Sequence, residues 1–227
     1  MKYLDNLYRY RKYFAEIIET EEGKISTYKE PFCGRAHVGI AVQAEHKYFS
    51  DTHKPIIALW QALLNNWRPP YLIGRKVVTY AWSRPTDFSE KAQGFIGYAY
   101  SRDGSFFGDT ITYKRFSSAG IQAYKALLRD LRTLNQTTSN SYGFVEADYR
   151  EVCISANAKE GDVFFLHPPQ TKKFVLTNEF ADTLYRLQQA KIATYVALNS
   201  NIKLPLEMYK KHWKLDTPIV YPILYKV

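Results

Sequence analysis

Residues 28–39 run Tyr28-Lys29-Glu30-Pro31-Phe32-Cys33-Gly34-Arg35-Ala36-His37-Val38-Gly39. A short run typical of a strand leads into a turn of small residues, and a helical pattern starts near His37. A turn of this kind brings backbone N–H groups and a helix N-terminus within reach of a ligand. The segment therefore predicts a strand–turn–helix unit with a ligand site beside it.

Helix and strand patterns alternate on both sides of this unit. Apolar residues at helical spacing predict helices, and short apolar runs bounded by turn residues predict strands. The predicted helices are Tyr8–Thr20, about His37–Ala44, Pro55–Asn66, Ser118–Leu134 and Asn178–Ala190; the predicted strands are Ile25–Phe32, Lys47–Ser50, Phe144–Ala147, Asp162–Leu166, Ile192–Leu198 and Ile219–Tyr225. The alternation predicts an open α/β sheet.

Ligands of open α/β sheets bind outside the carboxyl ends of the strands. Polar or small residues stand at four predicted strand ends: Cys33-Gly34, Asp51, Asp148 and His167-Pro168-Pro169-Gln170. An acid at the end of the second strand hydrogen-bonds a ribose hydroxyl in many nucleotide sites. It can equally be a helix cap or a turn residue. Taken in order, the four ends indicate a site for a nucleoside-containing cofactor.

The composition changes between residues 68 and 115. Glycine and proline punctuate this part, and arginine and aromatic residues alternate with them. We expect an irregular insertion here, and a loop over the polar run Asn135–Ser141. The predicted division is therefore one domain made of residues 1–66 and 118–227, with residues 67–117 inserted as a target-recognition region.

The charge balance favours a polyanionic partner. The 227 residues include 31 Lys and Arg against 22 Asp and Glu, a formal charge of +9, and 16% are aromatic. Basic side chains neutralise phosphates, and aromatic rings stack on bases. An aromatic core with solvated arginines is the alternative. The candidate DNA contacts in and beside the insertion are Arg75, Lys76, Arg84, Arg102, Lys114 and Arg115.

Several classes of protein are not expected. Two cysteines form neither a disulfide framework nor a zinc motif, and they favour a reducing compartment. His37, His46 and His53 lack the spacing of metal ligands, so we expect them to be exposed or hydrogen-bonded and expect no metal. No signal peptide and no apolar stretch of membrane-spanning length is visible, so we expect a cytoplasmic protein without a membrane partner.

The four strand ends together resemble the Dam-like DNA adenine N6-methyltransferases. Residues 28–34 are similar to the family's cofactor motif, and residues 48–51 to the strand that presents its ribose-binding acid. The resemblance covers most of the chain. It implies a Rossmann-like methyltransferase sheet that binds S-adenosylmethionine. The cofactor-binding residues that it implies are Tyr8, Phe32, Cys33, Gly34, Asp51, Asp148 and Tyr149.

The catalytic motif departs from the family's. His167-Pro168-Pro169-Gln170 stands where the family has Asp-Pro-Pro-Tyr, whose Asp orients the amine of a flipped adenine and whose Tyr stacks on the base. Asp5 and Leu7 replace a glycine and a lysine that help to hold the methionine end of the cofactor. Ala36 replaces a turn glycine, which is a milder change because alanine tolerates most backbone states except a positive φ.

Three hypotheses follow. The first is a relative that binds double-stranded DNA but is catalytically impaired or inactive, as an occupant of sites or as a partner of another DNA-processing protein. The second is an active methyltransferase in which His167 orients the target amine. The third is a protein-interaction module on a methyltransferase fold. The resemblance suggests a bacterial cell or a phage-infected host cell as the setting.

Overall fold

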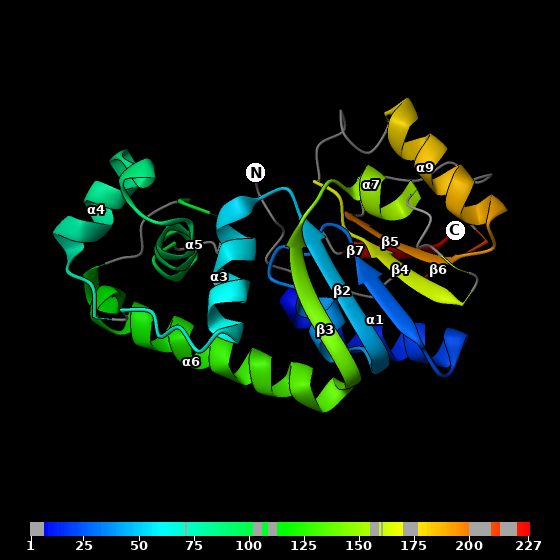
Figure 1. Ribbon diagram of the computed structural model, residues 1–227, viewed down its shortest axis with the longest axis horizontal. Coiled ribbons are helices and arrows are strands. Elements are labelled where there is room, and N and C mark those ends of the chain that lie inside the picture. Colours follow the sequence, from blue (N-terminus) through cyan, green and yellow to red (C-terminus); the bar gives the residue numbers. More distant parts are fainter. Residues whose placement is uncertain are drawn as a thin grey trace.

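The chain is a three-layer α/β structure with a helical extension at one end (Figure 1). The computed structural model describes residues 7–70, 72–101, 106–108, 113–154, 159, 161–169, 177–199, 210–213 and 222–227. The strands are β1 (Thr27–Glu30), β2 (Ala44–Asp51), β3 (Thr138–Glu146), β4 (Asp162–Leu166), β5 (Ala193–Asn199), β6 (Lys211–Trp213) and β7 (Pro222–Lys226). The helices are α1 (Leu7–Glu22), α2 (His37–Ala41), α3 (Lys54–Leu64), α4 (Arg75–Ser83), α5 (Glu90–Ala99), α6 (Tyr113–Thr137), α7 (Tyr149–Ile154) and α9 (Asn178–Gln189), with a 3₁₀ turn η1 (Pro85–Asp87).

The strands form one sheet in the order β3-β2-β1-β4-β5-β7-β6. The strands β1 to β5 are parallel, whereas β7 is antiparallel to β5 and to β6. The sequence runs outward in both directions from the boundary between β1 and β4, which makes this boundary the topological switch point. The predicted α/β fold class, a Rossmann-like sheet, is confirmed. The switch point brings the turn after Glu30 next to the segment after Leu166.

The two faces of the sheet pack against different helices. Successive side chains of a strand point to opposite faces of the sheet, so each central strand contributes to two cores. Val163 and Phe165 of β4 belong to a core with α1, α2 and α3, whereas Phe164 and Leu166 belong to a core with α7 and α9. Both faces of β4 are fully buried, which explains its continuous apolar sequence.

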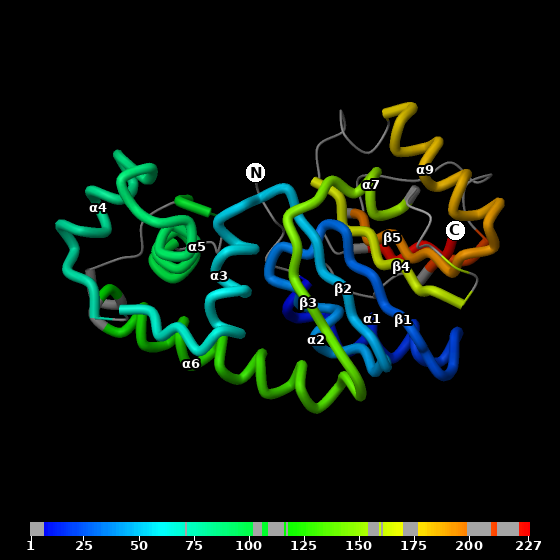
Figure 2. Tube along the Cα trace, viewed as in Figure 1, coloured from blue at the N-terminus to red at the C-terminus, as the bar shows by residue number. Residues whose placement is uncertain are grey.

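The insertion is helical, so the prediction of irregular structure was wrong. The helices α4 and α5 lie near each other (Figure 2). They share a small core of Val78, Ala81, Ile96 and Tyr100. Some of the glycines and prolines that suggested loops stand at helix boundaries or contacts. Gly74 is the N-cap of α4 and Pro85 begins η1. A Cβ at Gly94 would lie 2.1 Å from the Pro55 carbonyl oxygen, so this glycine allows α5 to pack on α3.

The loop predicted at Asn135–Ser141 was also wrong. The helix α6 continues to Thr137, and β3 begins at the next residue. Two features hide this from the sequence. β3 is an edge strand, so its polar residues face solvent, and the Thr137 hydroxyl is buried against the Lys47 ammonium and the Ile40 carbonyl. The other predicted elements are found with shifted ends. β2 extends over Ala44–Asp51, and residues 219–221 lie outside the described residues.

Candidate functional site

The turn after β1 is tied to the end of β2 by Asp51. Its Oδ2 accepts a hydrogen bond from the Gly34 N–H and its Oδ1 accepts one from the His53 N–H, both at 2.9 Å. Asp51 is only 3% exposed. Both carboxylate oxygens of the expected ribose-binding acid therefore accept hydrogen bonds within the protein. Cys33 beside it is buried, and burial raises the pKa of its thiol well above the ordinary value.

The same turn contains two residues with left-handed backbone. Gly34 has φ +48° and Ala36 has φ +53°. A left-handed conformation costs a residue with a Cβ roughly 1–2 kcal/mol. The replacement of glycine by Ala36 is therefore not mild, because the turn requires the one backbone state that alanine tolerates poorly. The turn is held in a strained form.

Aromatic rings fill the space between the β1 end and the helices α7 and α9. The Phe32 and Tyr149 rings stack with their centroids 4.9 Å apart, and the Phe180 ring of α9 packs on both. Tyr149 is buried. Two of the expected cofactor-binding side chains therefore contact each other directly.

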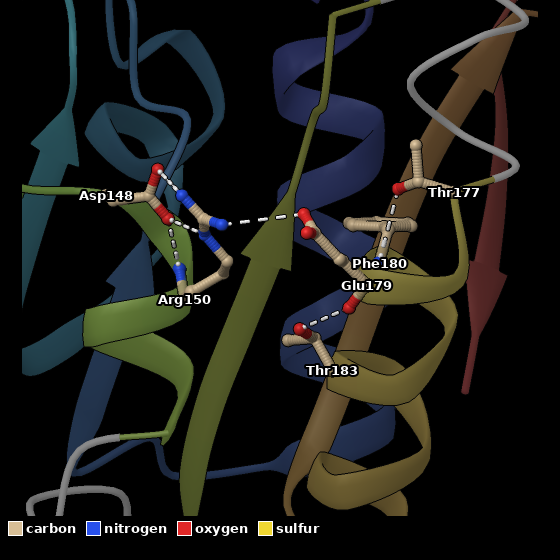
Figure 3. Close-up of polar contacts among 6 residues, drawn as sticks. All are labelled: Asp148, Arg150, Thr177, Glu179, Phe180 and Thr183. Atoms are coloured by element: carbon tan, nitrogen blue, oxygen red, sulfur yellow. Dashed lines mark hydrogen bonds and ion pairs between the residues drawn. The ribbon is translucent and has the colours of Figure 1, made fainter.

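Asp148 is held by an arginine two residues further on (Figure 3). The Arg150 Nε lies 2.8 Å from Oδ1, its Nη2 lies 3.2 Å from Oδ2, and its backbone N–H also donates to Oδ1. The hydrogen bond from the Arg150 side chain lowers the pKa of the Asp148 carboxyl. Arg150 also reaches Glu179 at 3.4 Å in the first turn of α9, where the Thr177 hydroxyl caps the helix by accepting a hydrogen bond from the Phe180 N–H. Asp148, one of the expected cofactor-binding residues, is thus part of a partly exposed ion-pair network.

His167 follows β4 and is buried. Burial lowers its pKa to about 4, so the imidazole is neutral at pH 7. Its Nε2 has no hydrogen-bond partner. Pro168 is buried and Pro169 half-buried, while Gln170 lies outside the described residues. The switch point therefore presents a neutral imidazole where the resemblance expects a carboxylate.

Positive groups gather near this imidazole. Tyr8 of α1 lies edge-on to the His37 ring, and the Arg11 guanidinium lies 3.9 Å from the centroid of the Tyr8 ring. Burial lowers the pKa of His37 well below its ordinary value, and Arg35, Arg11 and His167 lower it further. Neither Arg11 Nη1 nor His37 Nδ1 has a partner.

The expected cofactor acceptors do not fit S-adenosylmethionine in this arrangement. A ribose diol and an adenine amine both donate hydrogen bonds and need acceptors. Asp51 is buried and accepts from two backbone N–H groups, and the Asp148 carboxylate is paired with the Arg150 guanidinium. A cofactor that used Asp148 as an acceptor would compete with this guanidinium. The structure brings the expected residues to one edge of the sheet but leaves their polar groups bonded to one another.

Three of the candidate DNA contacts are exposed on or beside α4. Arg75 and Lys76 open the helix, and Arg84 directly follows it. A shallow groove lies along the helix and is lined by Arg75, Lys76, Thr79, Tyr80 and Ser83. Arg102 and the side chains of Lys114 and Arg115 lie outside the described residues.

Sequence reasoning missed several residues of the site. Arg150 had a local signal, since it stands two residues after Asp148. His37 was expected to be exposed or hydrogen-bonded, which is wrong, because it is buried and its Nδ1 has no partner. His46 and His53 do have contacts: Nδ1 of His46 lies 2.8 Å from the Ser141 hydroxyl, and Nδ1 of His53 lies 3.4 Å from the Tyr98 hydroxyl. No local pattern marked Arg11, because it meets His37 only through the packing of α1 on α2.

The described residues hold neither a metal-binding cluster nor a helix able to cross a membrane. No three His, Cys, Asp or Glu side chains in this part of the chain converge as ligands for a metal ion. None of the helices, over the residues that are described, combines the length and hydropathy that a bilayer crossing requires. Both cysteines are free and buried.

Comparison with known proteins adds a family and a set of weak structural likenesses. No curated protein sequence matches the chain. A conserved hypothetical protein of Streptococcus pyogenes is 11% identical, with 95% of this chain and 94% of that one covered and a TM-score of 0.46. A candidate methylase of Haemophilus influenzae is 13% identical (95% and 86% covered, TM-score 0.45), and a candidate methyltransferase of Escherichia coli is 10% identical (95% and 83% covered, TM-score 0.41). At these scores the fold assignment rests on the sheet order itself.

The family match includes the strand–turn–helix unit at residues 28–39. The model of the D12 class N6 adenine-specific DNA methyltransferases matches residues 11–103. This range runs from α1 through the turn after β1 and Asp51 to the end of α5. It does not reach Asp148 or His167. The resemblance drawn from the sequence is confirmed over this range: residues 11–103 are similar to the D12 class N6 adenine-specific DNA methyltransferases.

Proposed function

We propose that this chain is a DNA-binding relative of the D12 class adenine methyltransferases in which methyl transfer is impaired. One observation carries the proposal: Asp51 and Asp148, the two acids expected to receive the cofactor, are bonded to backbone N–H groups and to Arg150. A methyltransferase needs these acceptors open. A DNA-binding relative needs only the fold and a basic surface.

The catalytic segment supports the same conclusion. Loss of one positioned acceptor in a transition state lowers a rate by roughly 10²–10³-fold. A neutral His167 offers one acceptor in place of a carboxylate. Loss of the stacking ring at position 170 removes about 1–3 kcal/mol per base. Both losses act on the same flipped base, so they compound.

The insertion supports the DNA contact. Arg75, Lys76 and Arg84 are exposed, and the chain carries a formal charge of +9. Val78 and Ala81 of the same helix are buried in the small core. The helix is therefore packed on one side and presents its basic residues to a partner on the other.

One observation favours the second function, an active methyltransferase. His167 is neutral at pH 7 and its Nε2 lacks a partner, so the imidazole can accept a hydrogen bond from an amine. In that case Arg150 would have to leave Asp148 before a cofactor bound. A methyl-transfer assay on mixed-sequence duplex DNA separates the two functions. Impairment predicts no transfer, whereas transfer that disappears in His167→Ala would establish the enzyme.

DNA binding is tested by the double substitution Arg75→Gln and Lys76→Gln. Each phosphate contact contributes about 0.9 to the slope of log affinity against log salt. We expect the double variant to bind mixed-sequence duplex more weakly and to lower that slope by about two. Fluorescence anisotropy over a series of salt concentrations measures both quantities.

The matched control removes two charges elsewhere. Lys24 and Lys210 are exposed residues outside the insertion, and Lys24→Gln with Lys210→Gln gives the same net charge as the test variant. The control should keep most of the native slope. Native binding that is absent or insensitive to salt would contradict the DNA contact and favour the protein-interaction module.

A further inference from the structure

A cavity lies where α3, α5 and α6 meet, beside the turn after β1. Its volume is about 460 Å³, within the usual range for small-molecule sites. None of the residues expected to hold the cofactor lines it. Its lining side chains are mostly apolar and come chiefly from the three helices: Ile56 and Leu59 of α3, Phe95 and Tyr98 of α5, and Ala123 and Leu127 of α6.

One charged side chain lines the cavity. Arg35 extends from the turn after β1 and is half-buried. It forms no ion pair with any carboxylate of the described residues. Asp130 of α6 is buried, and burial raises the pKa of its carboxyl, whereas Arg35, Arg11 and Arg129 lower it. Three arginines therefore act on one buried carboxyl group.

A second observation also indicates missing negative charge. Arg11 Nη1 and His37 Nδ1 are buried polar atoms without a partner, and both residues are electrostatically coupled to this region. Buried polar groups of this kind are usually satisfied. The positive charges of Arg11 and Arg35 exceed the negative charge that Asp130 can carry. This excess creates a positive potential beside an apolar cavity.

We propose that this cavity binds a small amphiphile with one anionic head group, a carboxylate or a phosphate. The head group pairs with the Arg35 guanidinium, whose planar fork matches such oxyanions. The apolar body lies among Leu59, Phe95 and Leu127 and gains the free energy of leaving water.

Other ligand classes fit less well. A cation would meet Arg35 directly, and a neutral apolar molecule would cover the guanidinium without giving it a partner. A nucleic-acid strand carries a phosphate on every nucleotide, whereas the cavity offers one cation and an apolar wall. The site uses neither α4 nor the Asp51 and Asp148 carboxylates, so its test does not depend on the function proposed above.

The test titrates the full chain with decanoate, decyl phosphate, decylammonium and decanol by isothermal calorimetry. We expect at least one of the two anions to bind at least tenfold more tightly than the ammonium and the alcohol. The stronger anion identifies the head group. Arg35→Gln should weaken that binding at least tenfold, and Ala123→Phe should weaken it similarly by filling the cavity. Arg132→Gln, on an exposed part of α6, should change it less than twofold.

The two test variants act on different parts of the site, so one remains informative if the other fails to fold. Thermal unfolding of each variant identifies such a failure. Three results would overturn the proposal. The anions could bind no more tightly than decylammonium, both test variants could leave anion binding unchanged, or no anion could bind at millimolar concentration. None of these outcomes depends on DNA or on S-adenosylmethionine, so they leave the proposed function untouched.

Discussion

Glu30, at the end of β1, is a carboxyl group enclosed by protein. Its Oε2 accepts hydrogen bonds from the Gly39 N–H at 3.0 Å and from the Tyr28 hydroxyl at 3.1 Å. Burial raises its pKa to about 8, although Tyr28, Gly39 and the buried Lys47 oppose the shift. The folded protein therefore keeps a proton on Glu30 that the unfolded chain loses above its ordinary pKa of 4.5.

This proton makes stability depend on pH. The contribution of Glu30 is complete below pH 4.5 and is lost as the pH rises through about 8. Glu30→Gln should remove this loss, so the free energy of unfolding should fall less with pH in the variant than in the native chain. Urea unfolding between about pH 5 and pH 7 measures the slope. Glu16→Gln, an exposed change on α1, should keep the native slope, and an unchanged slope in Glu30→Gln would refute the assignment.

His167 should give the stability a pH dependence of opposite sign, over a pH range that overlaps that of Glu30. Its pKa is lowered to about 4, so its contribution is complete above 6.5 and is lost as the pH falls through 4. A shift of this size corresponds to about 3 kcal/mol. His167→Gln should therefore lose less stability than the native chain on acidification from pH 6.5. His46→Gln, a partly exposed histidine, is the control, and equal acid sensitivity of all three proteins would show that His167 is not buried as a neutral base.

At the scale of elements, composition set residues 68–115 apart but did not reveal their structure. Gly74 and Pro85 mark helix starts, and Gly94 and Gly97 mark close contacts. Gly94 and Gly97 sit inside α5, where Cβ atoms would strike the Pro55 carbonyl and the Phe106 ring. Single-sequence reasoning assigns glycine to turns because it cannot see a facing helix. For the same reason the length of β3 was missed, since its exposed edge lacks an apolar pattern.

Gly94 allows α5 to lie directly on α3. A methyl group there would meet the Pro55 carbonyl oxygen at 2.1 Å and Leu59 Cβ at 3.0 Å. Gly94→Ala should lower the free energy of unfolding by about 1–3 kcal/mol, because backbone rather than a flexible side chain blocks the space. Chemical denaturation measures the loss. Gly143→Ala on β3, where nothing lies within 4 Å of the new Cβ, is the control. A Gly94→Ala protein as stable as this control would disprove the close helix contact.

At the scale of the molecule, the sheet order determines which strand ends meet. The sequence predicted the alternation of strands and helices and the residues at four strand ends. It could not predict the order of strands, because that depends on contacts between distant segments. The contacts of Gly34 with Asp51 and of Phe32 with Tyr149 show that these predicted strand ends are neighbours. What the sequence missed is that Arg150 and the backbone N–H groups occupy the acids, since the partners of a side chain depend on three-dimensional packing.

The central claim is that the strand-end acids are closed to the cofactor. Isothermal calorimetry of the full chain with S-adenosylmethionine and with its demethylated product tests it without knowledge of a DNA target. Cooperative thermal unfolding of the same preparation shows that the protein is folded. We expect no binding of either ligand at millimolar concentration. Micromolar binding would contradict the account, because it would mean that Arg150 and the Gly34 N–H yield Asp148 and Asp51 to a ligand.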